Sequence, residues 1–183
     1  MVSGGNKVTP ENMYRTCLII AAALILSNGI YAGIVYMGGT IISFEAPAPD
    51  LMALKYIMAL LGALMFPVSL AFRNYLLNVD RIAARAVLMG ARAKSAEGIG
   101  EAAQTALAQM FVTGHIIPLA LTETMGIYGL VAYLVTGDKS YAYALIGAGF
   151  AAMVPHFPRK SVYNDMLARL DMIMMMMDGK KKK

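Results

Sequence analysis

The chain is short of charged residues, cysteine, histidine and tryptophan, and each shortage excludes a class of structure or site. Its single cysteine, Cys17, cannot form an internal disulfide, so cysteine content gives no indication of an oxidising compartment. Two histidines and one cysteine on separate segments do not supply a set of metal ligands. The sequence also has no glycine-rich phosphate loop and no paired nucleophile and base. We therefore expect neither a metal centre nor covalent catalysis.

The low charge content excludes an ordinary soluble domain. Charged residues make up 15% of the chain and hydrophobic residues 58%, whereas soluble domains have about 25% and about 45–50%. The apolar residues form unbroken blocks and do not alternate with polar ones at a helical or strand period. The 183 residues are thus expected to form a single membrane domain, residues 1–183.

Four apolar segments have about the length needed to cross a bilayer, which is roughly 20 residues in a helix. They are residues 17–37, 52–72, 111–135 and 141–157, of which the last is short and rich in glycine and alanine. The first begins like a signal peptide, but its apolar run is too long, so we expect it to remain as a span. These segments predict an all-α integral membrane protein with about four transmembrane helices arranged as hairpins.

Basic residues are concentrated in three places: before the first apolar segment, in the loop 73–107 and in the tail 158–183. The connection between the first two segments carries Glu45 and Asp50 and no Lys or Arg. Cytoplasmic loops collect Lys and Arg, so both termini and the loop 73–107 are predicted to be cytoplasmic. The formal charge of +5 follows from this distribution. It does not indicate a nucleic-acid partner, and it permits contact with anionic lipid headgroups.

Two cytoplasmic regions have helical patterns of their own. In the loop 73–107 we expect an extension of the second helix, a turn near Gly98 to Gly100 and a run into the third helix; a solvated connection is the alternative. In the tail, one helical face carries Val162, Met166, Leu170 and Ile173. That spacing predicts a short amphipathic C-terminal helix on the inner membrane surface.

Glu123 is the midpoint of the third apolar segment, residues 111–135. An ionised carboxylate at the bilayer centre costs at least about 2.5–3.5 kcal/mol, so the neutral acid is the expected resting form. An acid that can change between a neutral and an ion-bound form can carry a proton or a sodium ion. A protonated glutamate can also act as a hydrogen-bonding strut between helices. Both interpretations remain open.

Helical geometry places the neighbours of Glu123. At 100° per residue, its face is otherwise apolar and consists of Ile116, Leu119, Ile127, Leu130 and Leu134. Thr124 lies 100° away and Tyr128 about 140° away. His115 lies about 80° away and two turns toward the cytoplasm, where it is either a proton relay to Glu123 or a structural hydrogen-bonding group.

The stretch "ETMGIYGLV", Glu123 to Val131, resembles the ion-carrying helix of the proteolipids that form the rotor ring of vacuolar-type, archaeal-type and F-type rotary ATPases. The resemblance covers mainly residues 102–135. It implies that Glu123 binds the transported ion and that Thr124 and Tyr128 hold it through their hydroxyl groups. It also implies partners, namely membrane lipid, other subunits of a membrane complex and further copies of the chain.

The sequence departs from that family in ways that keep other functions open. The second segment has a single glycine, Gly62, where the family packs a glycine-rich helix, and only one of the four segments carries an acid. The second and fourth segments have no glutamine of the kind that binds sodium in that family, so a bound proton is expected over sodium and no other cofactor is expected. The chain is then at most an ion-translocating subunit. The alternatives are a structural or assembly subunit of a membrane complex and a small independent proton-coupled transporter.

Overall fold

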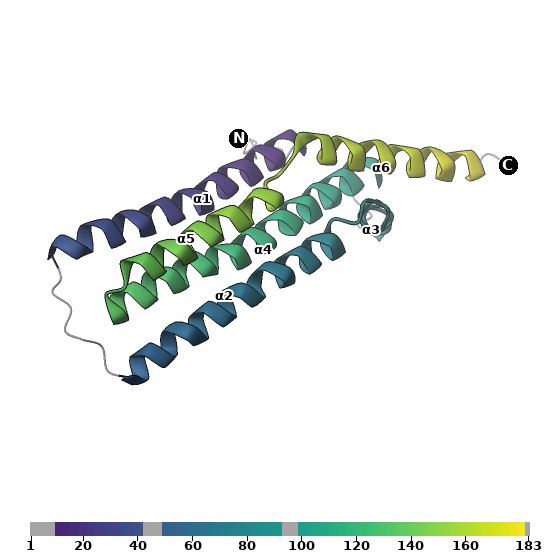
Figure 1. Ribbon diagram of the computed structural model, residues 1–183. Helices are drawn as coiled ribbons and strands as arrows, with labels where there is room; N and C mark the ends of the chain where they lie inside the picture. The colour runs from purple at the N-terminus through teal and green to yellow at the C-terminus, as the bar shows by residue number, and fades with distance from the viewer. Residues whose placement is uncertain (1–9, 42–48, 93–98, 182–183) are drawn as a thin grey trace. The chain divides into compact units, whose positions relative to one another are not determined.

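The structure, a computed structural model, describes residues 10–41, 49–92 and 99–181, and almost all of these residues lie in helices (Figure 1). The helices are α1 (Pro10–Ile41), α2 (Pro49–Leu76), α3 (Val79–Arg92), α4 (Ile99–Thr136), α5 (Lys139–Met153), a 3-10 helix η1 (Val154–His156) and α6 (Lys160–Lys181). The described residues contain no strand. The predicted all-α fold is confirmed.

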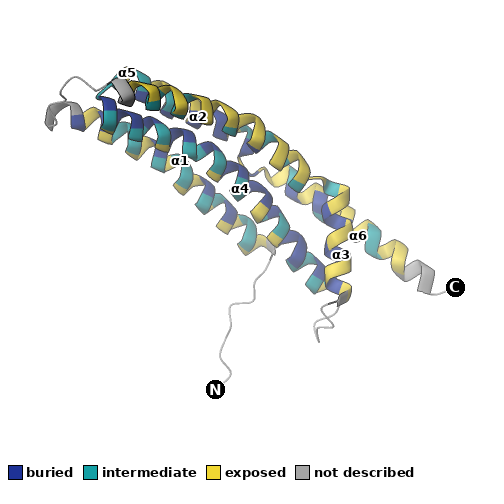
Figure 2. Cartoon of the chain, turned by 90° about the horizontal axis from the view of Figure 1, so that it is seen from below, coloured by how far each residue is buried: buried dark blue, intermediate teal, exposed yellow. Residues whose placement is uncertain are grey.

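Three of these helices are long and apolar enough to cross a membrane: residues 11–38 of α1, 52–76 of α2 and 100–136 of α4. This indicates a membrane protein, as predicted. The fourth predicted segment corresponds to α5, whose 15 residues are fewer than the roughly 20 that a bilayer requires. Within the candidate spans, 44% of the α4 window is buried, against 17% for α1 and 11% for α2. In Figure 2, α4 accordingly shows more buried residues than α1 and α2, so α4 is the most enclosed of the three.

The chain divides into two compact units, and α1 and α4 contribute to both. Unit 1 consists of residues 1–19, 74–115 and 158–183, and unit 2 consists of residues 20–73 and 116–157. Unit 1 thus holds α3, α6 and the first parts of α1 and α4. Unit 2 holds most of α2, the remainder of α1 and α4, and α5.

The loop 73–107 differs from the prediction because α2 does not continue through it. α2 ends at Leu76 and a separate helix, α3, begins at Val79. Asn78 starts that helix: its side-chain Oδ1 accepts a hydrogen bond from the Arg81 backbone N–H at 3.1 Å. The first backbone N–H groups of a helix have no carbonyl partner within that helix, and an asparagine at this position accepts a hydrogen bond from one of them. Gly98 lies outside the described residues, and Gly100 lies in the first turn of α4.

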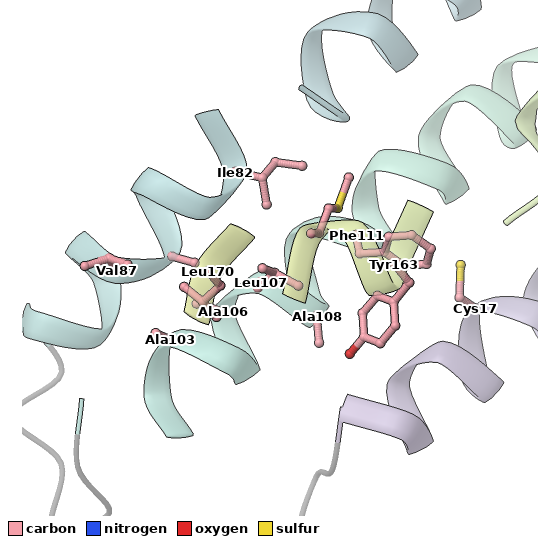
Figure 3. Close-up of a cluster of buried hydrophobic side chains, with 12 residues drawn as sticks. Cys17, Ile82, Val87, Ala103, Ala106, Leu107, Ala108, Phe111, Tyr163 and Leu170 are labelled. Carbon is pink, nitrogen blue, oxygen red and sulfur yellow. The ribbon is translucent and has the colours of Figure 1, made fainter. Parts of the chain in front are cut away.

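Unit 1 has a core of aromatic and aliphatic side chains from α1, α3, α4 and α6 (Figure 3). The rings of Phe111 on α4 and Tyr163 on α6 have centroids 4.9 Å apart, and Tyr14 on α1 stacks on Tyr163 at 5.7 Å. Burial in this core raises the pKa of the Tyr163 phenol. The predicted apolar face of α6 is correct, since Met166 and Leu170 are fully buried. The prediction did not anticipate that α3 and α4 cover this face.

Unit 2 is held by close approaches between helices. A Cβ atom added to Gly129 on α4 would lie 2.8 Å from the Ala142 carbonyl oxygen on α5, and one added to Gly149 on α5 would lie 3.1 Å from the Gly126 backbone nitrogen on α4. A methyl group at Gly129 would push the two backbones apart, and one at Gly149 would require its neighbours to move by a few tenths of an ångström. The connection between these two helices is equally tight: Gly137, at φ 72°, ends α4 in the left-handed conformation that glycine adopts most readily, and Asp138 caps α5.

Candidate functional site

Glu123 lies near the middle of the part of α4 that belongs to unit 2, and its carboxylate meets two hydroxyl groups of α1. Ser27 Oγ is 2.5 Å from Glu123 Oε1, and the Tyr31 hydroxyl donates to the same oxygen at 2.9 Å. Ser27 and Tyr31 are four residues apart and therefore lie on one face of α1. The acid is thus fixed against a polar spot on a neighbouring apolar helix.

The hydrogens of this cluster can be arranged in two complete ways. Ser27 Oγ lies 2.6 Å from the Leu24 carbonyl oxygen and 2.5 Å from Glu123 Oε1, but it has only one hydrogen to donate. When Glu123 is ionised, Ser27 and Tyr31 both donate to Oε1. When Glu123 is protonated, the acid donates a hydrogen bond to Ser27 Oγ, and the Ser27 hydroxyl donates to the Leu24 carbonyl oxygen. The site can therefore hold the carboxyl group with or without its proton.

The carboxyl group lies at the edge of the contact between α1 and α4. On one side, Leu119 is fully buried with Ala21 of α1. On the other side, Ile127 and Leu134 are 38% and 50% exposed. Glu123 itself is half-buried. An acid in this position is anchored to its own chain and is also accessible from the surrounding lipid or from a partner surface.

Asn28 strengthens the polar character of this part of α1. Its side chain is buried, and its Nδ2 lies 3.4 Å from the Leu24 carbonyl oxygen and 3.5 Å from Met153 Sδ. Its Oδ1 has no hydrogen-bond partner within the described part of the chain and lies directly against the backbone of Gly126. Gly126 has no side chain, which is what allows this contact. A buried amide beside Glu123 makes the local environment less apolar than the sequence of α4 suggests.

The structure does not bring the two predicted hydroxyl partners on α4 to Glu123. Thr124 Oγ1 donates to the Leu121 carbonyl of its own helix at 2.6 Å. The ring of Tyr128 lies on the side of α4 that faces Gly62 of α2, as its angular separation of about 140° from Glu123 requires. Among the described side chains, the hydroxyls bonded to the carboxylate come from α1. Whether Thr124 or Tyr128 takes part in ion binding stays a prediction.

Both histidines are buried. His115 belongs to unit 1, where its Nδ1 lies 2.9 Å from the Phe111 carbonyl oxygen and its ring centroid 4.2 Å from that of Phe111. Eight residues of helix, or about 12 Å of rise, separate it from Glu123, so its role as a relay stays a prediction. His156 is fully enclosed, with its Nε2 2.9 Å from Ser69 Oγ of α2.

A second polar cluster in unit 2 joins the start of α2 to the start of α5. The Lys55 ammonium group forms a salt bridge with Asp138 and lies 4.5 Å from the centre of the Tyr141 ring, and the Tyr141 hydroxyl donates to the Lys55 carbonyl at 2.5 Å. The hydrogen bonds from Lys55 and from the Tyr141 backbone N–H hold the pKa of Asp138 below its ordinary value. This cluster is a structural tie, since its charges neutralise each other.

Sequence reasoning found Glu123 but missed Ser27, Asn28 and Tyr31. The segment "SNGIYAG", Ser27 to Gly33, contains small residues of the kind that allow close contact between membrane helices. In the structure its polar residues make the contact, while Cβ atoms added to Gly29 and Gly33 would meet nothing within 4 Å. The available signal was the spacing of Ser27 and Tyr31, two hydroxyl groups on one face of an otherwise apolar helix.

In the described residues, no three His, Cys, Asp or Glu side chains gather closely enough to hold a metal ion. The cluster around Glu123 is therefore best described as a carboxyl group with two hydroxyl partners. Comparison of the chain with protein-family models, with curated proteins and with solved structures finds no significant match.

Proposed function

We propose that the chain is a proton-carrying membrane subunit of the proteolipid type, working in the membrane sector of a rotary ATPase or ATP synthase. The observation that carries the proposal is the cluster of Glu123, Ser27 and Tyr31, which offers Oε1 of the carboxyl group hydrogen bonds in both protonation states. The resemblance of "ETMGIYGLV" to the ion-carrying helix of that family supports it. A proton is favoured over sodium because the described oxygens around Glu123 belong to one acid and two hydroxyls.

The proposal includes four spans in two hairpins, with both termini on the cytoplasmic side. α5 is short, but it is tied to α2 at both ends, by Asp138 to Lys55 and by His156 to Ser69. Lys55 and Ser69 are 14 residues apart, or about 21 Å along α2. α5 and η1 thus run beside most of a candidate span, which supports a fourth crossing.

This topology can be tested by cysteine labelling in a Cys17→Ala background, since Cys17 is buried and its replacement by alanine leaves a chain with no other thiol. Ser43 and Ser95, which lie outside the described residues, are suitable positions for single cysteines. An impermeant reagent added from outside should label the first and not the second. The opposite pattern would overturn the topology.

A structural role for Glu123 is the second candidate, and the same hydrogen bonds favour it. Two bonds from α4 to α1 are what a strut provides, and interhelical hydrogen bonds in membranes contribute about 0.6 kcal/mol on average and up to about 1.7 kcal/mol. In that case the chain is an assembly or structural subunit. A proton carrier must release the proton of Glu123 and bind another, whereas a structural strut keeps it.

Substitution of Glu123 separates the two functions. Glu123→Gln keeps the size and hydrogen bonding of the side chain but cannot ionise. A carrier should then assemble normally and lose proton movement, while Glu123→Asp should retain part of it. A strut should tolerate Gln with little loss. Proton flux is measured in vesicles containing the assembled complex, with the purified chain alone in liposomes as the comparison. Full proton flux in an assembled Gln variant would end the carrier proposal.

The α1 partners provide a finer test of the same proposal. Tyr31→Phe removes one hydrogen-bond donor to Glu123. Ser27→Ala removes the hydroxyl group that accepts a hydrogen bond from the neutral acid. Both should lower proton flux while leaving the chain inserted. Ser140→Ala, at an exposed position on α5, is a matched control that should leave the flux unchanged.

A further inference from the structure

Unit 1 contains a cavity of about 260 Å³ where the end of α2, α3 and the first part of α4 meet. Arg81, Arg85 and Thr113 supply polar groups to its wall, and Leu76 and Met110 supply apolar ones. Pockets for drug-sized ligands usually measure about 300–1,000 Å³. This cavity is therefore large enough for a charged headgroup but not for a whole lipid.

The two arginines give the cavity a positive charge that no carboxylate among the described residues neutralises. They are four residues apart on α3 and so lie on the same side of that helix. Arg81 is held in place by Tyr75, whose ring centre lies 4.5 Å from the guanidinium carbon. The neighbouring acid, Asp80, is already paired with Arg169 at 2.8 Å. In the described parts of the chain, neither Arg81 nor Arg85 forms an ion pair with a carboxylate.

The position of the cavity decides which anion it suits. The candidate membrane span of α2 ends at Leu76, and Tyr75 and Leu76 both line the cavity. The cavity therefore adjoins the end of the α2 candidate span, which is where a helix that crosses a bilayer passes from acyl chains to headgroups. Arginine binds phosphate oxygens through its planar pair of N–H donors, and the apolar wall offers contact to the glycerol and the first methylene groups. A free phosphate ion would gain nothing from that wall.

We propose that this cavity is a binding site for the phosphate-bearing headgroup of an anionic phospholipid, with Arg81 and Arg85 as the phosphate ligands. The site is independent of Glu123 and of proton carriage. It would fix the α2–α3 corner of unit 1 at the membrane boundary.

Native mass spectrometry of the full chain in mild detergent tests this proposal. The protein is mixed with equal amounts of dioleoylphosphatidylglycerol and dioleoylphosphatidylcholine, which share their acyl chains and differ in net charge. The chain should retain one phosphatidylglycerol in preference to phosphatidylcholine. Arg81→Gln combined with Arg85→Gln should lower that retention by at least about tenfold. Equal retention of the two lipids, or unchanged retention in the double variant, would overturn the proposal.

A matched control removes the same charge elsewhere in unit 1. Arg159 and Lys160 are exposed and do not line the cavity, so Arg159→Gln with Lys160→Gln should leave lipid retention unchanged. A loss equal to that of the arginine pair would show that only net charge matters.

If Arg81→Gln with Arg85→Gln does not fold, Arg81→Lys with Arg85→Lys keeps the charge and should still weaken retention, because lysine lacks the planar donor pair. Displacement of the lipid by inorganic phosphate would assign the site to a free anion and contradict the lipid proposal.

Discussion

The two units of the chain bury different kinds of side chain. In unit 1, Phe111, Tyr163 and Leu170 are enclosed in one large cluster of aromatic and aliphatic side chains. In unit 2, the buried apolar clusters are small, and close glycine contacts and polar pairs also join the helices. Unit 1 thus has an extended apolar core, whereas unit 2 depends more on close approach and on polar contacts.

In a membrane bundle there is no hydrophobic driving force between helices, so close packing and hydrogen bonds must hold the helices together. The glycine contacts and polar pairs of unit 2 are contacts of that kind. The candidate proton site lies in unit 2, where Glu123 is bonded to two hydroxyl groups of α1.

The largest expected effect is in the core of unit 1. Phe111→Ala removes the ring that packs on Tyr14, Tyr163 and His115, and the loss should cost about 3–5 kcal/mol. Hydrogen exchange followed by mass spectrometry should show faster exchange in α3 and α6. Phe150→Ala, at a position 50% exposed in unit 2, is the matched control and should change exchange little. Equal effects of the two substitutions would remove the distinction between the units.

The next effect concerns the glycine contacts of unit 2. Gly129→Ala places a methyl group against the Ala142 carbonyl oxygen and should cost about 1–3 kcal/mol. Gly147→Ala meets nothing within 4 Å and should be neutral or stabilising by up to about 1 kcal/mol. Melting temperatures in detergent give the comparison. If Gly129→Ala melts no lower than Gly147→Ala, the two helices do not approach each other as described.

A smaller effect separates the salt bridges of the two units. The Lys55–Asp138 pair in unit 2 has side chains 13% and 35% exposed, and the Arg169–Asp80 pair in unit 1 has side chains 44% and 75% exposed. Double-mutant cycles with Lys55→Met and Asp138→Asn should give a coupling near the upper end of the range for exposed pairs, about 1 kcal/mol. Cycles with Arg169→Gln and Asp80→Asn should give about 0.2–0.5 kcal/mol. Equal couplings would contradict the difference in burial.

The same tie makes unit 2 sensitive to acid. The pKa of Asp138 lies below its ordinary value of 3.8 in the folded chain, so its contribution to stability is complete above that value. The contribution is lost as the pH falls through the lowered pKa, when Asp138 gains a proton. Melting temperature should therefore fall less between about pH 5 and about pH 2 in Asp138→Asn than in the wild type. An identical fall in both would show that the salt bridge does not contribute.

The smallest effect is expected at Thr124. Its hydroxyl bonds to the Leu121 carbonyl of its own helix, so Thr124→Val should leave proton flux in vesicles close to that of the wild type, in contrast to Ser27→Ala. A loss of flux as large as that of Ser27→Ala would restore Thr124 to the ion site predicted from the family resemblance.

The sequence predicts those features that depend on a single helix. The apolar segments, the central position of Glu123 and the apolar face of α6 all follow from composition and from 100° per residue. The choice of neighbour does not follow in this way. Ser27 and Tyr31 are more than 90 positions from Glu123 in the chain, and only the packing of α1 on α4 brings them together.

The same reason explains what the sequence does not predict. His156 has its hydrogen-bond partner, Ser69, on a helix 87 positions away in the chain, and it is fully enclosed. The extension predicted for the second helix does not form, because α2 ends at Leu76 and Asn78 caps a separate helix, α3.

The most direct test of the central claim is the reaction of Glu123 with a hydrophobic carbodiimide in membranes, mapped by mass spectrometry over a range of pH. A carbodiimide reacts with a protonated carboxyl group, which gives its proton to a carbodiimide nitrogen while its oxygen adds to the central carbon. If Glu123 exchanges its proton, modification should occur at this residue and slow reversibly as the pH rises, and it should be absent in Glu123→Gln. A permanently protonated strut would react at the same rate at every pH. A rate independent of pH, or no reaction at Glu123 in the folded chain, would contradict the account.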